Sequence, residues 1–137
     1  MKVVVETPKG SFVKYAFRGG VFVRELVSPL PTLFNYGFAE GSRSSDSQPC
    51  DVLILGSRLP QGTVLELNIL GYVQFIDDGV EDNKYIASVN GRITSFDRLK
   101  ISVFFSMYQV FKIVYYLVGK RSIKRCHYRG IIVNNMQ

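Results

Sequence analysis

The chain of 137 residues contains two cysteines, one histidine and no tryptophan. Two cysteines are too few for the disulfide framework of a small secreted domain, so we expect a reduced, cytoplasmic setting for Cys50 and Cys126. The single histidine, His127, argues against a histidine-based zinc site. The composition therefore directs the search for chemistry to carboxylates, bases and hydroxyls.

Long apolar runs are also absent. The N-terminal run Val3–Val5 ends at Glu6 and is shorter than a signal-peptide core, so we expect no secretion signal. The most apolar stretch, 101–118, carries polar residues on one helical face and apolar residues on another. The polar ones are Ser102, Ser106, Gln109 and Lys112, and the apolar ones are Val103, Met107, Phe111, Val114 and Val118. We therefore expect an amphipathic helix packed on a core, and no membrane span.

What the chain does contain suits a folded domain. Hydrophobic residues make up 47%, aromatic residues 13% and charged residues 20%, which is too apolar a composition for a disordered chain. The length fits one domain, residues 1–137.

The net charge of +6 divides unevenly along the chain. Residues 46–82 hold seven acids and one base, whereas residues 92–137 hold nine bases and one acid. Basic surfaces suit nucleic acids or other anions, and clustered carboxylates repel one another unless a cation or a basic group lies among them. The acidic middle is therefore the stronger indication of a site.

Short β-branched and aromatic runs between turn residues predict strands. We expect strands at 3–5, 12–17, 21–23, 52–55 and 84–89, with 63–76 as one strand or two broken near Gly71. We expect the main helix at 97–118 and a last strand or a tail at 131–133. This pattern favours a mainly β (α+β) fold, a small barrel with an appended helix.

Two short segments concentrate the carboxylates. Asp46 and Asp51 flank a proline before a buried strand, and Asp77 and Asp82 lie on a turn that leads to Lys84. Mg²⁺ takes oxygen ligands and is usually held by one or two carboxylates plus substrate phosphates. Aspartate also favours ordinary solvated turns, and either segment taken alone fits that interpretation better than a metal site.

The first segment, Asp46-x-x-Pro-x-Asp-Val-Leu, resembles the Asp-Gly-Asp-Pro-x-Asp-Val-Leu signature of the soluble family I inorganic pyrophosphatases. Further segments resemble later and earlier family elements in the correct order. They are Glu6-Thr7-Pro8, Lys14-Tyr15, Phe22-Val23-Arg24, Asn35-Tyr36-Gly37-Phe38, Leu59-Pro60-Gln61-Gly62, Gly71, Asp77 to Ala87, and Phe104-Phe105-x-x-Tyr108. The resemblance covers roughly residues 3 to 112, and several ordered motifs are more specific than one.

The resemblance implies a five-stranded OB-like closed barrel with a long C-terminal helix, and Mg²⁺-dependent hydrolysis of pyrophosphate to two phosphates. It also implies a homo-oligomer, with Mn²⁺, Zn²⁺ or Co²⁺ as substitutes for Mg²⁺. By position, the metal ligands would be Asp46, Asp51, Asp77 and Asp82. The catalytic and phosphate-binding residues would be Lys14, Arg24, Tyr36 and Lys84. Tyr108 would be a further substrate contact, and Glu6 would lie in the outer shell of the site.

Four positions depart from the family pattern. Gln48 stands where the family has the aspartate that helps orient and deprotonate the attacking water, and an amide cannot take that proton. Ala16 replaces a glutamate, Gln109 a lysine, and Val23 the aspartate before the arginine. We therefore expect an enzyme of reduced activity.

Two alternatives remain. The chain could be a degenerate relative that binds metal or a phosphorylated ligand without turnover, as Gln48 and Ala16 suggest. It could also be an OB-like nucleic-acid binding module that uses the basic tail with Tyr115, Tyr116 and Tyr128. The position of the acids makes pyrophosphate the expected partner and nucleic acid an unlikely one.

Overall fold

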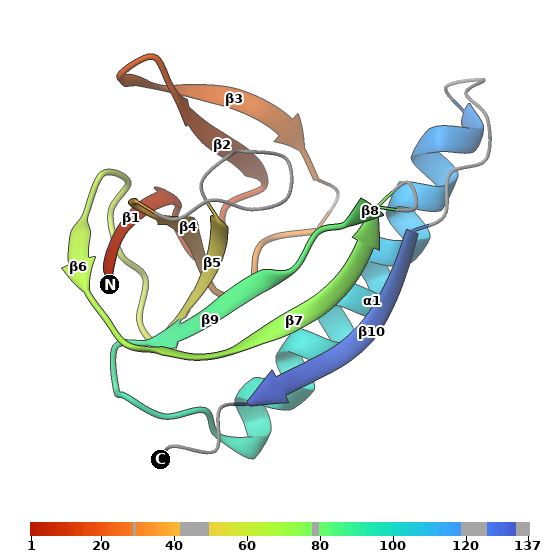
Figure 1. Ribbon diagram of the computed structural model, residues 1–137. Helices are drawn as coiled ribbons and strands as arrows, with labels where there is room; N and C mark the ends of the chain where they lie inside the picture. Colours follow the sequence, from red (N-terminus) through yellow and green to blue (C-terminus); the bar gives the residue numbers. More distant parts are fainter. Residues whose placement is uncertain (29, 42–49, 78–79, 119–125, 134–137) are drawn as a thin grey trace.

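The computed structural model describes residues 1–28, 30–41, 50–77, 80–118 and 126–133, although not the side chains of 77, 80, 81, 112, 113, 115–118, 126 and 127. These described residues are mainly β with one helix, as the sequence predicted (Figure 1). The elements are β1 (Lys2–Thr7), β2 (Val13–Arg18), β3 (Val21–Val27), β4 (Asn35–Ala39), β5 (Cys50–Leu55), β6 (Val64–Glu66), β7 (Ile69–Asp77), β8 (Val80–Glu81), β9 (Lys84–Ser88), α1 (Ser95–Val118) and β10 (Cys126–Val133).

The strands form one large sheet and one separate hairpin. The sheet has eight strands in the order β10-β7-β9-β5-β4-β1-β6, with β8 paired to β7, and the hairpin is β2–β3. Among the described residues no pairing joins the edge strands β10 and β6, so the expected five-stranded closed barrel is not confirmed. The physical reason is that β10 adds antiparallel to the outer side of β7 and lengthens the sheet at that edge.

Most of the expected strands are present, and the last one is a strand, not a tail. Two expectations about boundaries are wrong. Residues 35–39 form a strand that the sequence analysis left unassigned, and the break between β6 and β7 lies at residues 67–68 instead of near Gly71. Gly71 is an interior residue of β7, where β10 pairs closely alongside. A Cβ added there would lie 2.2 Å from the carbonyl oxygen of Ile132, so the position requires glycine.

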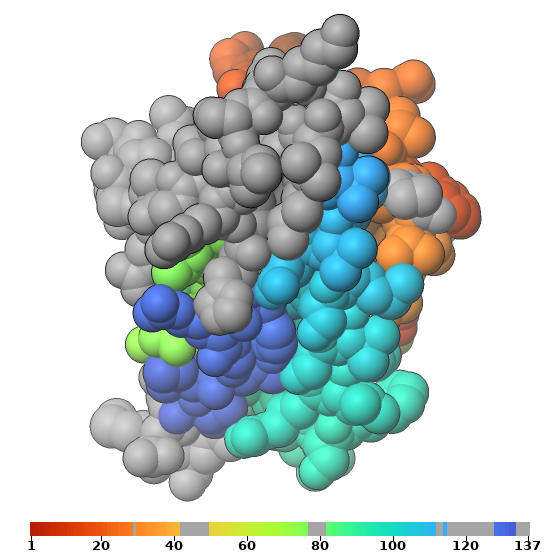
Figure 2. All heavy atoms as spheres, turned by 90° about the vertical axis from the view of Figure 1, so that its right-hand side faces the viewer, coloured from red at the N-terminus to blue at the C-terminus, as the bar shows by residue number. Residues whose placement is uncertain are grey.

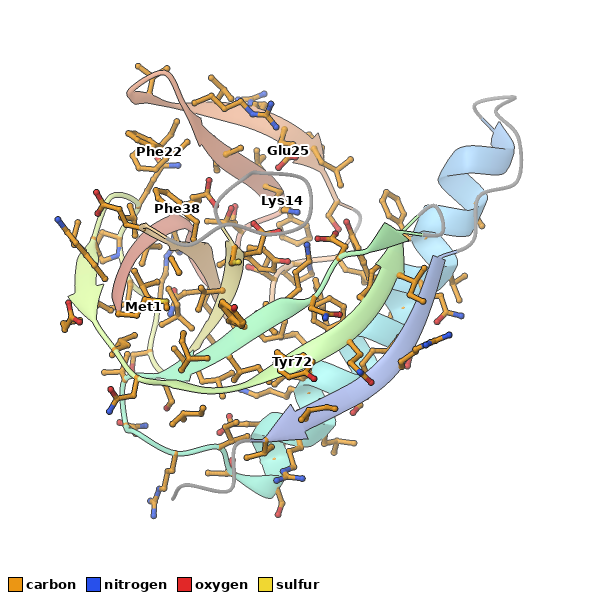
Figure 3. All side chains as sticks on the ribbon, viewed as in Figure 1. Met1, Lys14, Phe22, Glu25, Phe38 and Tyr72 are labelled. Carbon is orange, nitrogen blue, oxygen red and sulfur yellow. The ribbon has the colours of Figure 1, made fainter. Side chains whose placement is uncertain are left out.

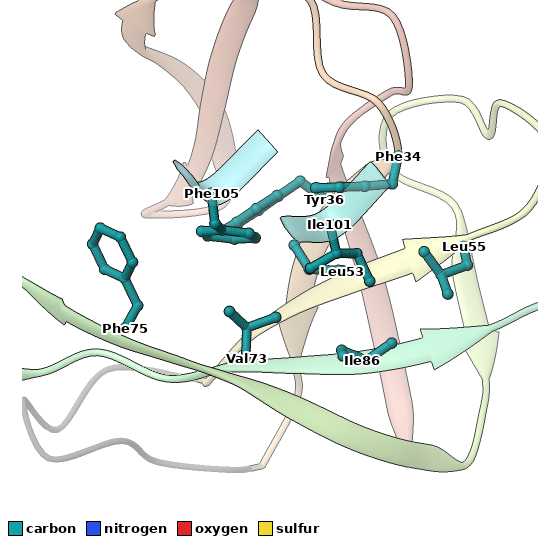
Figure 4. Packing of buried hydrophobic residues seen from close by; sticks show 9 residues of the cluster. All are labelled: Phe34, Tyr36, Leu53, Leu55, Val73, Phe75, Ile86, Ile101 and Phe105. Carbon is teal, nitrogen blue, oxygen red and sulfur yellow. The ribbon is translucent and has the colours of Figure 1, made fainter. Parts of the chain in front are cut away.

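Two buried clusters occupy the two faces of the sheet. Alternate side chains of β5 point to opposite faces, so Leu53 and Leu55 join one cluster while Val52 and Ile54 join the other. Figure 4 shows the first cluster, in which Ile101 and Phe105 of α1 lie over Leu53, Val73 and Ile86. Burial on both faces explains why 52–55 is a continuous apolar run.

The helix α1 packs with a different face from the one expected. A reciprocal pair of hydrogen bonds between Thr94 and Asp97, both 3.0 Å, caps its N-terminus. Ile101 and Phe105 are buried, whereas Val103 and Met107 are each 44% exposed. The expectation that the Val103 face would pack on the core is therefore wrong.

The polar face of α1 turns toward β10, which explains this orientation. Ser102 Oγ lies 3.0 Å from the hydroxyl of Tyr128, and Gln109 Oε1 accepts a 2.8 Å hydrogen bond from the backbone N–H of Tyr128. Across the described part of the chain, no helix has the length and apolarity needed to cross a membrane.

Candidate active site

Lys84 joins two aspartates at the start of β9. Its Nζ lies 2.6 Å from Oδ2 of Asp51 and 2.8 Å from Oδ2 of Asp82. The parallel pairing of Val52 with Tyr85 places Asp51 beside Lys84, and Asp82 precedes Lys84 by two residues. The Lys84 side chain is 6% exposed, and the two aspartates are 34% and 37% exposed. We call these three residues the Lys84 cluster.

The surroundings of Lys84 favour its protonated form. Desolvation of the buried ammonium lowers its pKa, but Tyr36, Asp51 and Asp82 outweigh this effect and raise the pKa well above its usual value. Lys84 therefore stays protonated at any physiological pH. About a third of each aspartate side chain remains exposed in these ion pairs, so the cluster is open to a charged ligand.

Tyr36 and Lys14 extend the cluster toward the hairpin. Burial raises the pKa of Tyr36 well above its usual value, even though Lys84 lies nearby, so its hydroxyl remains a neutral donor. Lys14 Nζ lies 4.9 Å from the centre of the Tyr36 ring, within the range of a cation–π interaction. Figure 3 shows Lys14 between the hairpin and the sheet. The structure thus brings together Lys14, Tyr36 and Lys84, three of the positions that the resemblance marks as phosphate-binding.

Glu6 fixes the hairpin that carries Lys14. It is the extra residue of a β-bulge, because Val5 pairs with Gly37 and Thr7 with Tyr36. Its Oε2 accepts a 2.6 Å hydrogen bond from the backbone N–H of Phe17 on β2. Burial raises the pKa of Glu6 to about 7, against the lowering effect of that hydrogen bond. Glu6 therefore connects the sheet to the hairpin, and the charges of Asp51 and Lys14 act on it.

Arg24 lies on β3 and is exposed. No hydrogen bond or ion pair joins it to the Lys84 cluster within the described residues. On the same hairpin Ala16 pairs directly with Val23. These two positions, where the family pattern that the sequence resembles has acids, therefore face each other across the strands, and both are apolar here.

Tyr108 and Gln109 are neighbours in α1, but their side chains contact different parts of the protein. Tyr108 stacks on Phe104, with ring centres 6.1 Å apart, and acts electrostatically on Tyr36. Gln109 instead binds the backbone of Tyr128, so it faces β10. The position where the family carries a lysine is therefore used here to join α1 to the sheet.

Asn35 positions the loops around these residues. Its fully buried amide accepts hydrogen bonds from the backbone N–H groups of Lys9 (3.0 Å) and Leu59 (2.9 Å). It also donates to the carbonyl oxygens of Ile54 (3.3 Å) and Ser57 (2.8 Å). The sequence analysis quoted Asn35 only as part of a motif. A polar residue inside an apolar run, two residues before a glycine, is the signal that could have identified it.

Gly37 allows β1 to approach β4 closely. A Cβ at this position would lie 2.0 Å from the carbonyl oxygen of Val4, a separation that no real contact shows. Glycine is therefore required between Tyr36 and Phe38, because a side chain would force β1 away from β4.

The cation ligands can be tested only in part. Asp46 and Gln48 lie outside the described residues, and of Asp77 only the backbone is described, at the end of β7. Asp51 and Asp82 each bind Lys84 through Oδ2 alone, and within the described chain no partner occupies either Oδ1. Two carboxylates that are each about a third exposed fit a hard divalent cation. The same part of the chain holds no group of three carboxylate, histidine or cysteine ligands.

Of the three tyrosines considered for nucleic-acid stacking, the structure describes the side chain of Tyr128. Tyr128 is half-buried against Phe105, with ring centres 6.0 Å apart. The side chains of Tyr115 and Tyr116 lie outside the described ones.

Comparison with known proteins agrees with this geometry. The profile of the family described as inorganic pyrophosphatase matches residues 3–114. The inorganic pyrophosphatase of Halalkalibacterium halodurans is 37% identical over 92 residues, which is 64% of this chain and 56% of that protein. That of Bradyrhizobium diazoefficiens is 32% identical over 107 residues, 73% of this chain and 60% of that protein. The chain thus spans little more than half the length of these relatives.

Solved structures show the same fold. The Helicobacter pylori inorganic pyrophosphatase superimposes with a TM-score of 0.79 at 22% identity, over 98% of this chain and 84% of that chain. The Thermus thermophilus inorganic pyrophosphatase gives 0.76 at 22% identity, over 97% and 82%. The profile match, the sequence relatives and the shared fold agree with one another, and the chain belongs to the inorganic pyrophosphatase family.

Proposed function

We propose that this chain hydrolyses inorganic pyrophosphate to two phosphates and depends on Mg²⁺. The observation that carries the proposal is the Lys84 cluster: one buried ammonium shared by two open carboxylates, next to Tyr36 and Lys14. Such an arrangement offers cation ligands and phosphate-binding groups side by side. We further propose that residues 1–137 act as one domain, in the cytoplasm and as a homo-oligomer.

The basic and phenolic groups act on the phosphate oxygens. Lys84 is always charged and is fixed in position, so it can stabilise negative charge on the departing phosphate without moving. Tyr36 remains a neutral phenol and donates a hydrogen bond. Lys14 and the exposed Arg24 approach from the hairpin, and Tyr108 from α1. These groups bind and orient a polyanion, and none of them forms a covalent bond with it.

The proposed cation ligands are Asp46, Asp51, Asp77 and Asp82. When bound there, Mg²⁺ or a substitute such as Mn²⁺, Zn²⁺ or Co²⁺ supplies charge neutralisation and a bound water with a lowered pKa. Asp51 and Asp82 are held at defined positions by Lys84, so the chain supplies part of the ligand set before the cation arrives.

We propose that the rate is lower than that of relatives with an acid at position 48. The amide of Gln48 can hold a water through a hydrogen bond but cannot accept its proton. Activation of the attacking water then depends on the cation alone, which lowers the pKa of the water bound to it.

A second candidate is a relative that binds a cation and a phosphorylated ligand without turnover. The observations that favour it are the bond from Gln109 to β10 and the apolar Ala16–Val23 pair. The variant Gln48→Asp separates the two candidates. If it raises phosphate release at least tenfold, the surrounding groups are competent for catalysis, whereas no gain above background favours a binding role.

The primary test is the release of phosphate from pyrophosphate by the unmodified chain with each of the four cations. Release above background with Mg²⁺, removed by a chelator and restored by added Mg²⁺, supports the proposal. Release at background with all four cations would overturn it.

A further inference from the structure

The hairpin that carries Lys14 and Arg24 is separate from the main sheet. β2 and β3 form their own two-stranded sheet, and within the described residues no strand pairing joins them to β1. In Figure 1 the hairpin rises above the main sheet, and in Figure 2 the orange atoms of this part of the chain lie at the surface, at the upper right. The placement of Lys14 and Arg24 therefore depends on side-chain contacts.

Two side chains of β1 take the place of strand pairing. Thr7 is completely buried, and its Oγ1 accepts a 3.0 Å hydrogen bond from the backbone N–H of Tyr15 on β2. The same hydroxyl lies 3.4 Å from the carbonyl oxygen of Tyr15, to which it donates. Glu6 binds the backbone N–H of Phe17, two residues further along β2. Along this edge of β2, side-chain oxygens thus replace the carbonyl oxygens of a partner strand.

The bulge at Glu6 turns the Thr7 side chain to the face from which it reaches β2. Cross-strand partners share one face of a sheet, and Val5 pairs with Gly37, whereas Thr7 pairs with Tyr36. Val5 and Tyr36 belong to the clusters on opposite faces. Because side chains alternate along a regular strand, Thr7 without the bulge would share the face of Val5. The extra residue therefore moves the Thr7 hydroxyl to the face of Tyr36.

We propose that Thr7 is a positioning residue, which holds Lys14 and Arg24 in place for phosphate binding through its bonds to Tyr15. The backbone of Thr7 pairs with Tyr36, and its hydroxyl holds Tyr15, the residue next to Lys14. Lys14 Nζ lies 4.9 Å from the centre of the Tyr36 ring, so Thr7 connects both sides of this contact.

The same contact determines the position of Arg24. Tyr15 pairs with Arg24 across the hairpin, and the register of the hairpin shifts between Lys14 and Tyr15. Such a shift disrupts the ladder locally, so the hairpin alone fixes the two bases poorly relative to each other. A bond to Tyr15 at this point fixes both of them.

The inference rests on the proposed function, because it concerns how two bases meet a phosphate. The test is calorimetric binding of imidodiphosphate, a pyrophosphate analogue with a nitrogen bridge, in the presence of Mg²⁺. Thr7→Val keeps the shape of the side chain but removes both hydrogen bonds, so it should weaken binding by about tenfold, the effect of roughly one lost hydrogen bond to a charged group. KM for pyrophosphate should rise in parallel. Thr7→Ser keeps the hydroxyl and should bind like the unmodified chain.

Thr63→Val is the matched control. The hydroxyl of Thr63 donates a 2.6 Å hydrogen bond to the carbonyl oxygen of Pro60 in an exposed turn, and its loss should leave the affinity unchanged. A purely structural role for Thr7 predicts fewer folded molecules in Thr7→Val, with the original affinity in those that remain. That result would overturn the proposal.

The placement of Lys14 can be measured without any ligand. Side-chain protons of Lys14 above the Tyr36 ring should resonate upfield in proton NMR spectra of the unmodified chain and of Thr7→Ser, and this shift should disappear in Thr7→Val. An unchanged Lys14 shift in folded Thr7→Val would contradict the proposal, whether or not pyrophosphate is the substrate. Phosphate release, measured separately, tests hydrolysis alone.

Hydrogen exchange at the Tyr15 amide tests the contact in the unmodified chain, so the proposal does not depend on the folding of a variant. The bond to a buried hydroxyl predicts slow exchange at this amide. Exchange as fast as that of an exposed amide would show that Thr7 does not hold Tyr15.

Discussion

Nζ of Lys84 lies 2.6 Å from Oδ2 of Asp51, across the parallel ladder between β5 and β9. This contact joins an acid from one predicted motif to a base from another, 33 residues apart. It is also the point at which the proposed cation site and phosphate site meet.

We expect Mg²⁺ to stabilise the chain through Asp51. At ten times its dissociation constant, Mg²⁺ should raise Tm by about 3–6 °C, because it binds the folded state only. Asp51→Asn should abolish this rise, and Glu40→Gln, an exposed acid paired with Lys2, should keep it. Differential scanning calorimetry with and without a chelator measures the effect. An equal rise for Asp51→Asn would show that the cation binds elsewhere.

Lys84→Met should destabilise the chain by about 1–3 kcal/mol. It leaves Asp51 and Asp82 without their shared cation, and their partial exposure moderates the cost. Urea unfolding without metal measures the loss. Added Mg²⁺ should recover more stability in Lys84→Met than in the unmodified chain, because the cation then replaces the ammonium. A variant as stable as the original would contradict the assigned role of Lys84.

Glu6 should make stability depend on pH. Its pKa is raised to about 7 in the folded chain, so the folded state favours the protonated form. The stabilisation is fully present below about pH 4.5 and is lost as the pH rises through 7, a change of roughly 3 kcal/mol. Denaturant unfolding between pH 4.5 and 8, in a chelator, should show this fall in the unmodified chain. Glu6→Gln, which keeps an acceptor for Phe17, should lack it, and identical pH profiles would refute the assignment.

Gly37→Ala should cost roughly 2–4 kcal/mol, because the new Cβ would collide with the carbonyl oxygen of Val4 and force β1 away from β4. Gly20→Ala is the comparison. Gly20 has a φ of +85° but open space around it, so its substitution should cost only about 1 kcal/mol. Urea unfolding of both variants measures which one loses more stability. A larger loss for Gly20→Ala would mean that the contact between β1 and β4 tolerates a side chain at position 37.

Gln109→Lys should lower stability by about 1–2 kcal/mol, because lysine cannot accept the hydrogen bond from the Tyr128 backbone. Gln109→Glu keeps an acceptor and should lose less. Hydrogen exchange at the Tyr128 amide follows the contact directly. Unchanged protection in Gln109→Lys would show that this bond does not hold β10 on α1.

The proximity of Asp51, Asp82 and Lys84 could be anticipated from the sequence because their motifs follow the order and spacing of the resembled family. Asp51 precedes a buried strand, and Lys84 begins another, so pairing of those strands brings them together. Glu6 was placed in an outer shell only by resemblance, and its contact with Phe17 depends on a bulge that no local pattern shows. The missed strand β4 is short and follows Pro31 closely, so its run of alternating residues was too brief to identify.

The packing face of α1 could not be predicted, because the helix is apolar on two sides. Helical periodicity marks Val103 and Met107 as clearly as it marks Ile101 and Phe105. The choice between them is made by tertiary contacts: Ser102 and Gln109 bind β10 and turn Ile101 and Phe105 inward. The predicted closure of the barrel was not confirmed for a similar reason, because the pairing of the edge strands depends on where β10 adds to the sheet.

The most direct test of the central claim is phosphate release from pyrophosphate, measured side by side for the unmodified chain, Asp51→Asn and Glu40→Gln with Mg²⁺. The proposed site predicts Mg²⁺-dependent release by the unmodified chain and by Glu40→Gln, and a fall of at least 100-fold in Asp51→Asn, in line with loss of a metal ligand. Release at background by the unmodified chain, or equal release by Asp51→Asn, would contradict it.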